Sequence, residues 1–337
     1  MPAHRKFVFV RRPLGMPTGD EFRLVEEPTP FPGRGQVLIH TCYMSVDPYM
    51  RGRMREGRSY APPWQVGEAP SAGAVGQVVA SEQADLPVGA IVSGTWDWSE
   101  YVVSDGRGLR LLDPSRAPMT TALGVLGMPG LTAYFGTFEV AQPRAGDTFV
   151  VSAAAGAVGA AAGQLAKKAG CRVVGIAGSR AKVDFLLQDL KFDNAVDYRA
   201  APDLREALRT VCPDGVDIYF DNVGGAVTTA IAPLMNTHGR VAVCGQIATY
   251  NQAERQPSDF PWDLISRRLR IEGFLVGDFQ PKYGEALARM EQWVRSGSLQ
   301  YRETVIDGFE KMPQALLGLF EGANFGKQLV KVSDPTA

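Results

Sequence analysis

Residues 150–182 read VVSAAAGAVGAAAGQLAKKAGCRVVGIAGSRAK, and this stretch decides the fold. Its Ala, Gly and Val residues are compatible with three structures: a membrane span, a core helix packed through small residues, or a strand that meets a helix over a bound phosphate. A transmembrane helix needs about 20 strongly apolar residues. Because Asp147 and Lys167 bracket a shorter and weakly apolar segment, the membrane span is excluded.

The same stretch has the order of parts that binds a dinucleotide. An apolar strand leads into A-x-G-x-x-G, formed by Ala154, Gly156 and Gly159, and a helix follows at once. Gly156 would let a pyrophosphate approach the backbone, and the helix N-terminus would offer it free N–H groups. Because Ala154 stands where the fingerprint has its first glycine, a tightly packed core helix stays open as the alternative.

The chain of 337 residues is long enough for two domains. Residues 1–125 contain short alternating apolar segments between Gly and Pro turns, which predicts a β-rich domain completed by 301–337. Residues 126–300 alternate apolar strands with helices, which predicts a doubly wound parallel sheet. The expected strands of this second domain are 147–153, 171–177, 194–198, 215–224 and 239–245, and the expected helices are 157–169, 180–189, 202–211 and 225–234. The fold class is therefore α/β.

The residues after the second strand indicate which dinucleotide fits. An NAD site usually carries Asp or Glu there, whereas this chain has Gly178, Ser179, Arg180 and Lys182. Ser179, Lys182 and Arg180 could bind a 2′-phosphate, so NADPH is favoured over NADH. The alternative for the two cations is a solvated first helical turn, where the helix dipole slightly disfavours them.

Composition narrows the function further. The net charge is −1, so no strong field attracts nucleic acid or an anionic membrane. Four scattered cysteines without a C-x-x-C pair fit reduced thiols. The first residues show no signal-peptide pattern, and we expect a cytoplasmic protein.

Seven motifs in order resemble one family over nearly the whole chain. They are VDPYMRGRM (46–54), GMPGLTAYFG (127–136), VVSAAAGAVG (150–159), AGSRAK (177–182), YFDNVGG (219–225), VAVCGQIATYN (241–251) and ANFGKQLVKV (323–332). The sequence is similar to the zinc-independent alkenal double-bond reductases of the medium-chain dehydrogenase/reductase superfamily. This resemblance implies a GroES-like catalytic domain, a Rossmann cofactor domain, a homodimer, and NADPH-dependent reduction of the C=C bond of α,β-unsaturated aldehydes and ketones.

Such a reaction needs a donor for the oxygen of the enolate that hydride addition creates. By resemblance, Tyr250 is the catalytic candidate beside the nicotinamide, and Tyr49 lines the opposite wall of the cleft. The alternative for each tyrosine is aromatic packing with a hydrogen-bonded hydroxyl.

The resemblance also assigns cofactor-binding residues. They are Gly156, Ala157, Val158 and Gly159 at the pyrophosphate, Gly178, Ser179, Lys182 and Tyr198 at the adenosine phosphate, and Asn222, Cys244, Tyr250, Phe274, Leu275, Val276 and Asn324 on the nicotinamide side. Cys244 could equally be a small buried apolar residue.

No zinc site is expected. His40 and Cys42 lie two apart in an apparent strand, and the chain lacks both a Gly-His-Glu stretch and a four-cysteine lobe. Packing is the preferred interpretation of both residues.

Three points stay open from the sequence. Besides the double-bond reductase, a quinone reductase and a non-catalytic NADPH-binding protein share the fold and the cofactor. The Pro-rich segments 59–68 and 256–262 suit either a bulky apolar ligand or loop packing. Residues 270–277 are expected to form a late strand, which in relatives continues the sheet through a dimer; an internal edge strand covered by 281–296 is the alternative.

Overall fold

The computed structural model describes residues 3–57, 59–252 and 263–336, and the chain divides into two compact units. The first unit comprises Met1–Gly124, Glu303–Asn324 and Gln328–Ala337, and the second comprises Val125–Arg302 and Phe325–Lys327. Each unit has a sheet of its own.

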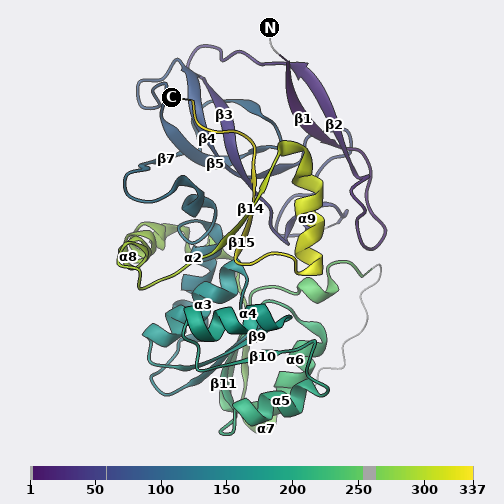
Figure 1. The fold of residues 1–337 in the computed structure, drawn as a ribbon, viewed down its shortest axis with the longest axis vertical. Coiled ribbons are helices and arrows are strands. Elements are labelled where there is room, and N and C mark those ends of the chain that lie inside the picture. Colours follow the sequence, from purple (N-terminus) through teal and green to yellow (C-terminus); the bar gives the residue numbers. More distant parts are fainter. Residues whose placement is uncertain (1–2, 58, 253–262, 337) are drawn as a thin grey trace. The chain divides into compact units, whose positions relative to one another are not determined.

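The first unit is β-rich. Its main sheet has the order β14-β15-β3-β4-β5-β7, with β6 paired to β3, and β1 and β2 form a separate antiparallel pair. The strands are β1 (Ala3–Phe9), β2 (Phe22–Pro28), β3 (Val37–Ser45), β4 (Ser71–Ser81), β5 (Ile91–Asp97), β6 (Tyr101–Ser104), β7 (Arg110–Leu112), β14 (Glu303–Asp307) and β15 (Lys327–Lys331). The unit also contains helix α9 (Met312–Glu321), which Figure 1 labels, and the short helix α1 (Met50–Arg53).

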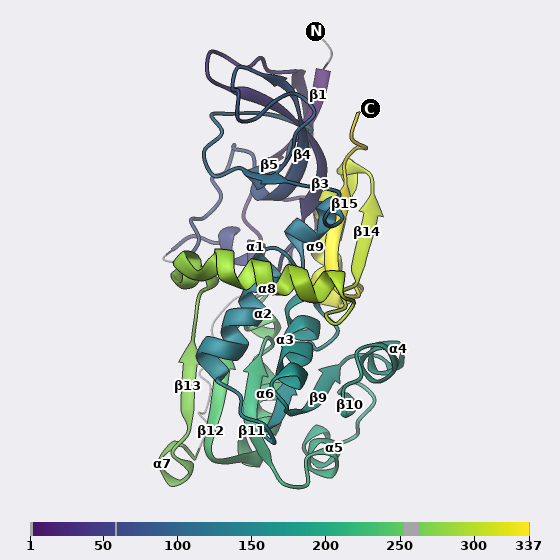
Figure 2. The ribbon, with the colours of Figure 1, turned by 90° about the vertical axis from the view of Figure 1, so that its left-hand side faces the viewer.

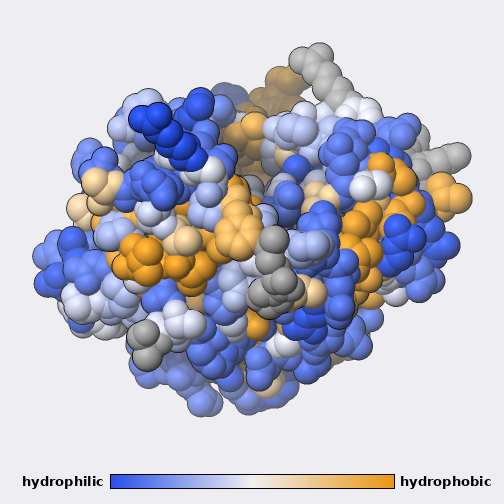
Figure 3. Space-filling model, turned by 90° about the horizontal axis from the view of Figure 1, so that it is seen from above, coloured by the Kyte–Doolittle hydropathy of each residue, from blue (hydrophilic) through white to orange (hydrophobic). Residues whose placement is uncertain are grey.

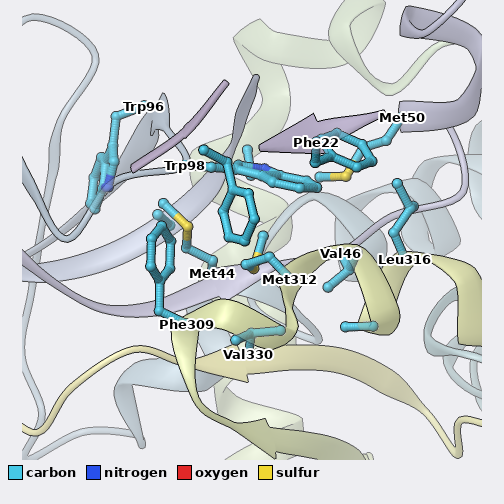
Figure 4. Packing of buried hydrophobic residues seen from close by; sticks show 14 of the residues in the cluster. Phe22, Met44, Val46, Met50, Trp96, Trp98, Phe309, Met312, Leu316 and Val330 are labelled. Carbon is cyan, nitrogen blue, oxygen red and sulfur yellow. The ribbon is translucent and has the colours of Figure 1, made fainter. Parts of the chain in front are cut away.

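The core of the first unit is an aromatic and methionine cluster (Figure 4). Phe22 stacks on Trp98 with ring centroids 4.9 Å apart, and Phe309 of the returning C-terminal segment joins the same cluster. Alternate residues of the strands supply these side chains, which is the period expected of a sheet with one buried face. The cluster therefore fixes the position of helix α1, whose Met50 is fully buried in it.

The second unit is a doubly wound parallel sheet with the order β10-β9-β8-β11-β12-β13. Its strands are β8 (Thr148–Val151), β9 (Arg172–Ala177), β10 (Asn194–Asp197), β11 (Val216–Asp221), β12 (Met235–Val243) and β13 (Arg270–Gly273). All four residues of β8 are buried, as expected of a central strand covered on both faces. The predicted α/β fold class is confirmed.

Helices cover both faces of this sheet. The helices are α2 (Met128–Phe135), α3 (Ala157–Lys168), α4 (Arg180–Asp184), α5 (Leu204–Val211), α6 (Gly225–Ile231), α7 (Leu264–Arg267) and α8 (Tyr283–Arg295). Side chains of α5 and α6 form one core with Val150 and Tyr219 of the sheet. Figure 2 shows α2 and α3 in front of the sheet and β13, β12 and β11 side by side.

Several predicted elements have other bounds in the structure: the strand expected over 215–224 ends at Asp221, the strand expected over 239–245 spans Met235–Val243, and the helix expected over 225–234 is an α-helix to Ile231. The strand expected over 270–277 ends at Gly273 because its neighbour β12 ends at the paired Val243. Phe274 instead packs edge to face against Phe220, with ring centroids 6.2 Å apart. The helix expected over 180–189 is an α-helix only to Asp184 and continues as a π-helical turn over Phe185–Asp189.

The surface of the protein mixes polar and apolar residues. The face in Figure 3 is mostly hydrophilic, with apolar patches between the polar regions. Large exposed apolar side chains include Leu14, which is 97% exposed, and Ile265, which is 91% exposed. Within the described ranges, no helix has the length and apolar character needed to cross a membrane.

Candidate cofactor and active site

The loop between β8 and α3 forms the predicted phosphate cradle. Gly156 is the N-cap of α3 and has no side chain to cap the first N–H groups, so the turn at Ala157 and Val158 can offer them to an anion. A Cβ at Gly159 would lie 2.4 Å from the Ala153 carbonyl oxygen, so only glycine lets the helix approach the loop this closely. Ala153, not Ala154, takes the left-handed backbone conformation here, with φ 48°.

The segment around Gly326, distant in sequence, forms hydrogen bonds with this loop. The backbone N–H of Gly326 donates to the Ala155 carbonyl at 2.8 Å, and Gly326 forms an isolated bridge with Gly156. Gly326 has φ 61°, and a Cβ there would lie 1.8 Å from the Arg302 carbonyl oxygen. The sequence motifs included this glycine in ANFGKQLVKV without revealing its contact with the phosphate loop.

The next strand end brings the predicted adenosine-phosphate residues together. Ser179 caps α4 by accepting a hydrogen bond from the Lys182 backbone N–H at 3.3 Å. A Cβ at Gly178 would lie 2.8 Å from the Tyr198 ring. The two residues are close because Gly178 follows β9, Tyr198 follows β10, and these strands pair in parallel. Burial, with a contribution from the nearby Arg199, lowers the pKa of the Lys182 ammonium group.

Arg199 is a functional candidate that sequence reasoning missed. Its guanidinium lies over the Tyr198 ring at 5.7 Å, and its Nε donates to the Tyr198 hydroxyl at 3.2 Å. Its only sequence signal is that it follows the predicted Tyr198. Arg180, in contrast, is 86% exposed in its side chain and pairs with Asp184 at 2.9 Å. Lys182, after β9, and Arg199, after β10, are therefore cations that lie near each other at the paired ends of these strands.

The carboxyl end of β11 positions Asn222. Its backbone N–H donates to the Ser152 hydroxyl at 2.9 Å, and its side-chain amide donates to the Ser152 carbonyl at 2.8 Å. These bonds join the end of β11 to the end of β8, where ligands of open α/β sheets collect. Asn222 thus lies at the edge of the sheet where the phosphate loop begins.

Tyr250 and Cys244 lie on the loop after β12. Tyr250 is half-buried, and its hydroxyl oxygen accepts a hydrogen bond from the Gln246 backbone N–H at 3.3 Å. Burial is the main cause that raises the pKa of Tyr250, and burial raises the pKa of Cys244 to about 12. Both groups therefore keep their protons at neutral pH.

The remaining nicotinamide-side candidates differ in their surroundings. Phe274 packs on Phe220, and Gly136 leaves the space that its ring fills, since a Cβ there would lie 2.5 Å from it. Leu275 is 42% exposed, and the Val276 carbonyl accepts from the Tyr283 hydroxyl at 2.9 Å. Asn324 is assigned to the first unit and directly precedes Phe325.

Tyr49 belongs to the first unit, where it precedes helix α1 and packs against the core cluster. Burial and the nearby Asp47 raise the pKa of Tyr49 to about 12. The Asp47 carboxylate is itself buried and accepts a hydrogen bond from the Ser45 hydroxyl. Tyr49 is thus held as a neutral phenol.

His40 and Cys42 are used in packing. The His40 ring stacks on Tyr101 with centroids 4.5 Å apart, and Cys42 is fully buried. Outside the segments left undescribed, no group of three or more His, Cys, Asp or Glu side chains could hold a metal ion. Of the two Pro-rich segments, 59–68 places Trp64 in the core with 3% exposure, whereas 256–262 lies outside the described residues.

Comparison with known proteins identifies the family. A family described as "N-terminal domain of oxidoreductase" matches residues 5–112, and one described as "Zinc-binding dehydrogenase" matches residues 157–292. The NADPH-dependent curcumin reductase of Escherichia coli is 42% identical over 98% of this chain and 97% of its own length. The chain belongs to the double-bond reductase branch of the medium-chain dehydrogenase/reductase superfamily.

Two further relatives support this membership. The NADP(+)-dependent 2-alkenal reductase of Nicotiana tabacum is 42% identical over 89% of this chain and 88% of its own length. The crystal structure of CurA from Vibrio vulnificus in complex with NADPH has 42% identity and a TM-score of 0.94, covering 98% of this chain and all of CurA. The family resemblance predicted from the seven motifs is confirmed.

Proposed function

We propose that this protein uses NADPH to reduce the C=C bond of α,β-unsaturated aldehydes and ketones. The observation that carries the proposal is the strand end at Gly178, where Ser179, Lys182 and Arg199 supply donors and positive charge for a 2′-phosphate, and where the Asp197 carboxylate accepts from the Arg199 backbone N–H at 3.0 Å. The names of the relatives, a curcumin reductase and a 2-alkenal reductase, support the conjugated carbonyl as substrate class.

The chain's own residues fit the cofactor NADP(H). Gly156 and Gly159 leave a cradle that side chains would fill, and the first turn of α3 supplies N–H donors for a pyrophosphate. Ser179, Lys182 and Arg199 supply donors and positive charge for the 2′-phosphate. When bound, the cofactor supplies the hydride that adds to the β-carbon of the substrate.

The protein's part in the reaction is to hold charge and protons. The Tyr250 O–H group donates to the substrate carbonyl oxygen, where negative charge grows as the enolate forms. Tyr49 is the second donor in this proposal. Because the pKa of each phenol is raised, both remain protonated donors at neutral pH. In this proposal the two tyrosine hydroxyls, and not a zinc ion, stabilise the enolate oxygen, since His40 and Cys42 are used in packing.

Assembly and location belong to the same proposal. β13 lies at the end of the six-stranded sheet and pairs with β12 alone among the described strands, so its other side can pair with a second copy to form a homodimer. The four cysteines are free, which suits the reducing cytoplasm.

The test is to follow NADPH oxidation with trans-2-nonenal and, separately, with a benzoquinone, and to identify the products. We expect a saturated aldehyde whose carbonyl is intact. Turnover of the quinone alone would make the protein a quinone reductase, and tight NADPH binding without turnover of either compound would make it a binding protein. Either result overturns the proposal.

A further inference from the structure

The Asp221 carboxylate is the centre of a hydrogen-bond network at the carboxyl end of β11. The residue is 3% exposed. Its Oδ1 accepts from the Tyr219 hydroxyl at 2.8 Å and from the backbone N–H groups of Val223 and Gly224, each at 2.9 Å. Its Oδ2 accepts from the Thr228 hydroxyl at 2.7 Å. The side chain therefore fixes the turn over 222–224 and the first turn of α6.

This carboxylate is held by neutral donors. No Lys, Arg or His forms an ion pair with Asp221 in the part of the chain that the structure describes. The Ser152 hydroxyl lies 3.3 Å from Oδ1 and adds a further donor. Burying a carboxylate without a cation is costly, and a fully satisfied network of donors offsets this cost and makes the segments it joins rigid.

The main chain of Asp221 fixes a second loop. Its carbonyl oxygen accepts from the backbone N–H of Cys244 at 2.8 Å and from that of Gly245 at 3.0 Å. The turn that its side chain holds adds another bond, since the Val223 carbonyl accepts from the Ala248 N–H at 3.0 Å. One residue thus ties together the loop that carries Asn222 and the loop that carries Tyr250.

The two loops are in close contact as a result. A Cβ at Gly245 would lie 3.3 Å from the Asn222 carbonyl oxygen and 3.4 Å from the Tyr250 hydroxyl. After burial, the charge of Asp221 is a further cause that raises the pKa of Cys244. It is also among the smaller causes that raise the pKa of Tyr250, and it helps to keep this phenol protonated.

We propose that Asp221 is a positioning residue for the reductase: its carboxylate holds the turn that carries Asn222 and, through the bond between the Val223 carbonyl and the Ala248 N–H, the loop that carries Tyr250, in the one arrangement that receives the nicotinamide and the substrate. The inference rests on the proposed function for the role of Tyr250. It predicts that loss of the carboxylate disturbs the nicotinamide half of the cofactor and leaves the adenosine half bound as before, because Ser179 and Lys182 follow a different strand.

The experiment compares Asp221→Asn with Asp217→Asn in the full-length protein. Asp217 lies at the other end of β11, where its carboxylate accepts from the Thr148 N–H at 2.8 Å and the Asn236 amide at 2.8 Å. For Asp221→Asn we expect kcat with trans-2-nonenal to fall about tenfold. We also expect the loss of the emission gain, by which we mean the increase in NADPH fluorescence when the cofactor binds the protein. The affinity for 2′,5′-ADP, which probes the adenosine half, should stay unchanged, and Asp217→Asn should keep kcat and the emission gain.

The outcomes separate positioning from general loss of structure. If Asp221→Asn loses 2′,5′-ADP binding as strongly as kcat, the whole domain is disturbed and the proposal is overturned. The proposal is also overturned if both kcat and the fluorescence of bound NADPH are unchanged. If Asp221→Asn does not fold, Thr228→Val removes the donor to Oδ2 at nearly constant volume and should lower emission and kcat in the same pattern; no change in either overturns the proposal. The emission and 2′,5′-ADP measurements need no turnover, so they test Asp221 even if the proposed substrate class is wrong.

Discussion

Tyr198 packs against the backbone of Gly178, so closely that a Cβ at Gly178 would lie 2.8 Å from the tyrosine ring. The two residues follow the paired ends of β9 and β10, and Tyr198 in turn contacts the Arg199 guanidinium. The missing side chain of one residue thus sets the place of the cation proposed to bind the 2′-phosphate.

Replacing Gly178 with alanine should weaken NADPH binding. The new methyl group would displace the Tyr198 ring and, with it, Arg199. We expect the dissociation constant of NADPH, measured by fluorescence titration, to rise about tenfold, the loss of roughly one charge-assisted hydrogen bond. Gly284→Ala is the matched control, because a Cβ there meets nothing within 4 Å. Equal affinities of the two variants would contradict the assignment.

Lys182→Ala and Arg199→Ala should each reduce the preference for NADPH over NADH. Each removes a charge-assisted hydrogen bond that we propose to the 2′-phosphate, so kcat/KM with NADPH should fall about tenfold to a hundredfold. The value with NADH should be unchanged, since NADH has no 2′-phosphate. Arg180→Ala, at a residue paired with Asp184, should leave both values as they are. A parallel loss with both cofactors would mean that neither cation reads the phosphate.

Tyr250→Phe should lower kcat on an alkenal by about a hundredfold, the usual cost of losing one oxyanion donor. The affinity for NADPH should hardly change, because the phenyl ring keeps the packing of the tyrosine. Stopped-flow traces of NADPH oxidation would separate the chemical step from product release. Full retention of kcat would remove Tyr250 from the proposed mechanism and leave Tyr49 to be tested in the same way.

Ala153→Gly should stabilise the protein. Ala153 has φ 48°, and a left-handed backbone costs a residue with a Cβ about 1 kcal/mol relative to glycine. We expect the free energy of unfolding of the second unit, measured by urea denaturation, to rise by up to about 1 kcal/mol. The greater chain entropy of glycine in the unfolded state reduces this gain. Ala154→Gly is the control and should destabilise, because Ala154 is fully buried and does not share the left-handed conformation.

His40 should make the first unit less stable in mild acid. Burial is the main cause that lowers the pKa of its imidazole below 6.5, so the folded state binds fewer protons than the unfolded chain. Stability from this group is complete above pH 6.5 and is lost as the pH falls from there through the lower, folded pKa. His40→Phe, which keeps the stacking on Tyr101, should reduce the change of the urea midpoint between pH 7 and pH 5. If the urea midpoint depends on pH equally in the wild type and in His40→Phe, His40 is not the source of the acid sensitivity.

The sequence by itself determined the parts of the fold that depend on local pattern. The apolar run into Gly156 and Gly159 and the strand–helix alternation define the parallel sheet and its phosphate loop, because period and glycine placement act over a few residues. The motifs then indicated the family, and the comparisons confirm it.

Only the tertiary structure decided which distant residues meet. Arg199 comes to Lys182 because β9 and β10 run in parallel with their ends level, and Gly326 comes to Ala155 from the far end of the chain. Asp221 joins the loops of Asn222 and Tyr250 because the successive strands β11 and β12 pair in parallel, and Ser152 reaches Asn222 because β8, much earlier in the chain, pairs with the other side of β11. These contacts depend on strand order and register, which are set by packing over the whole unit and leave no mark in any short stretch of sequence.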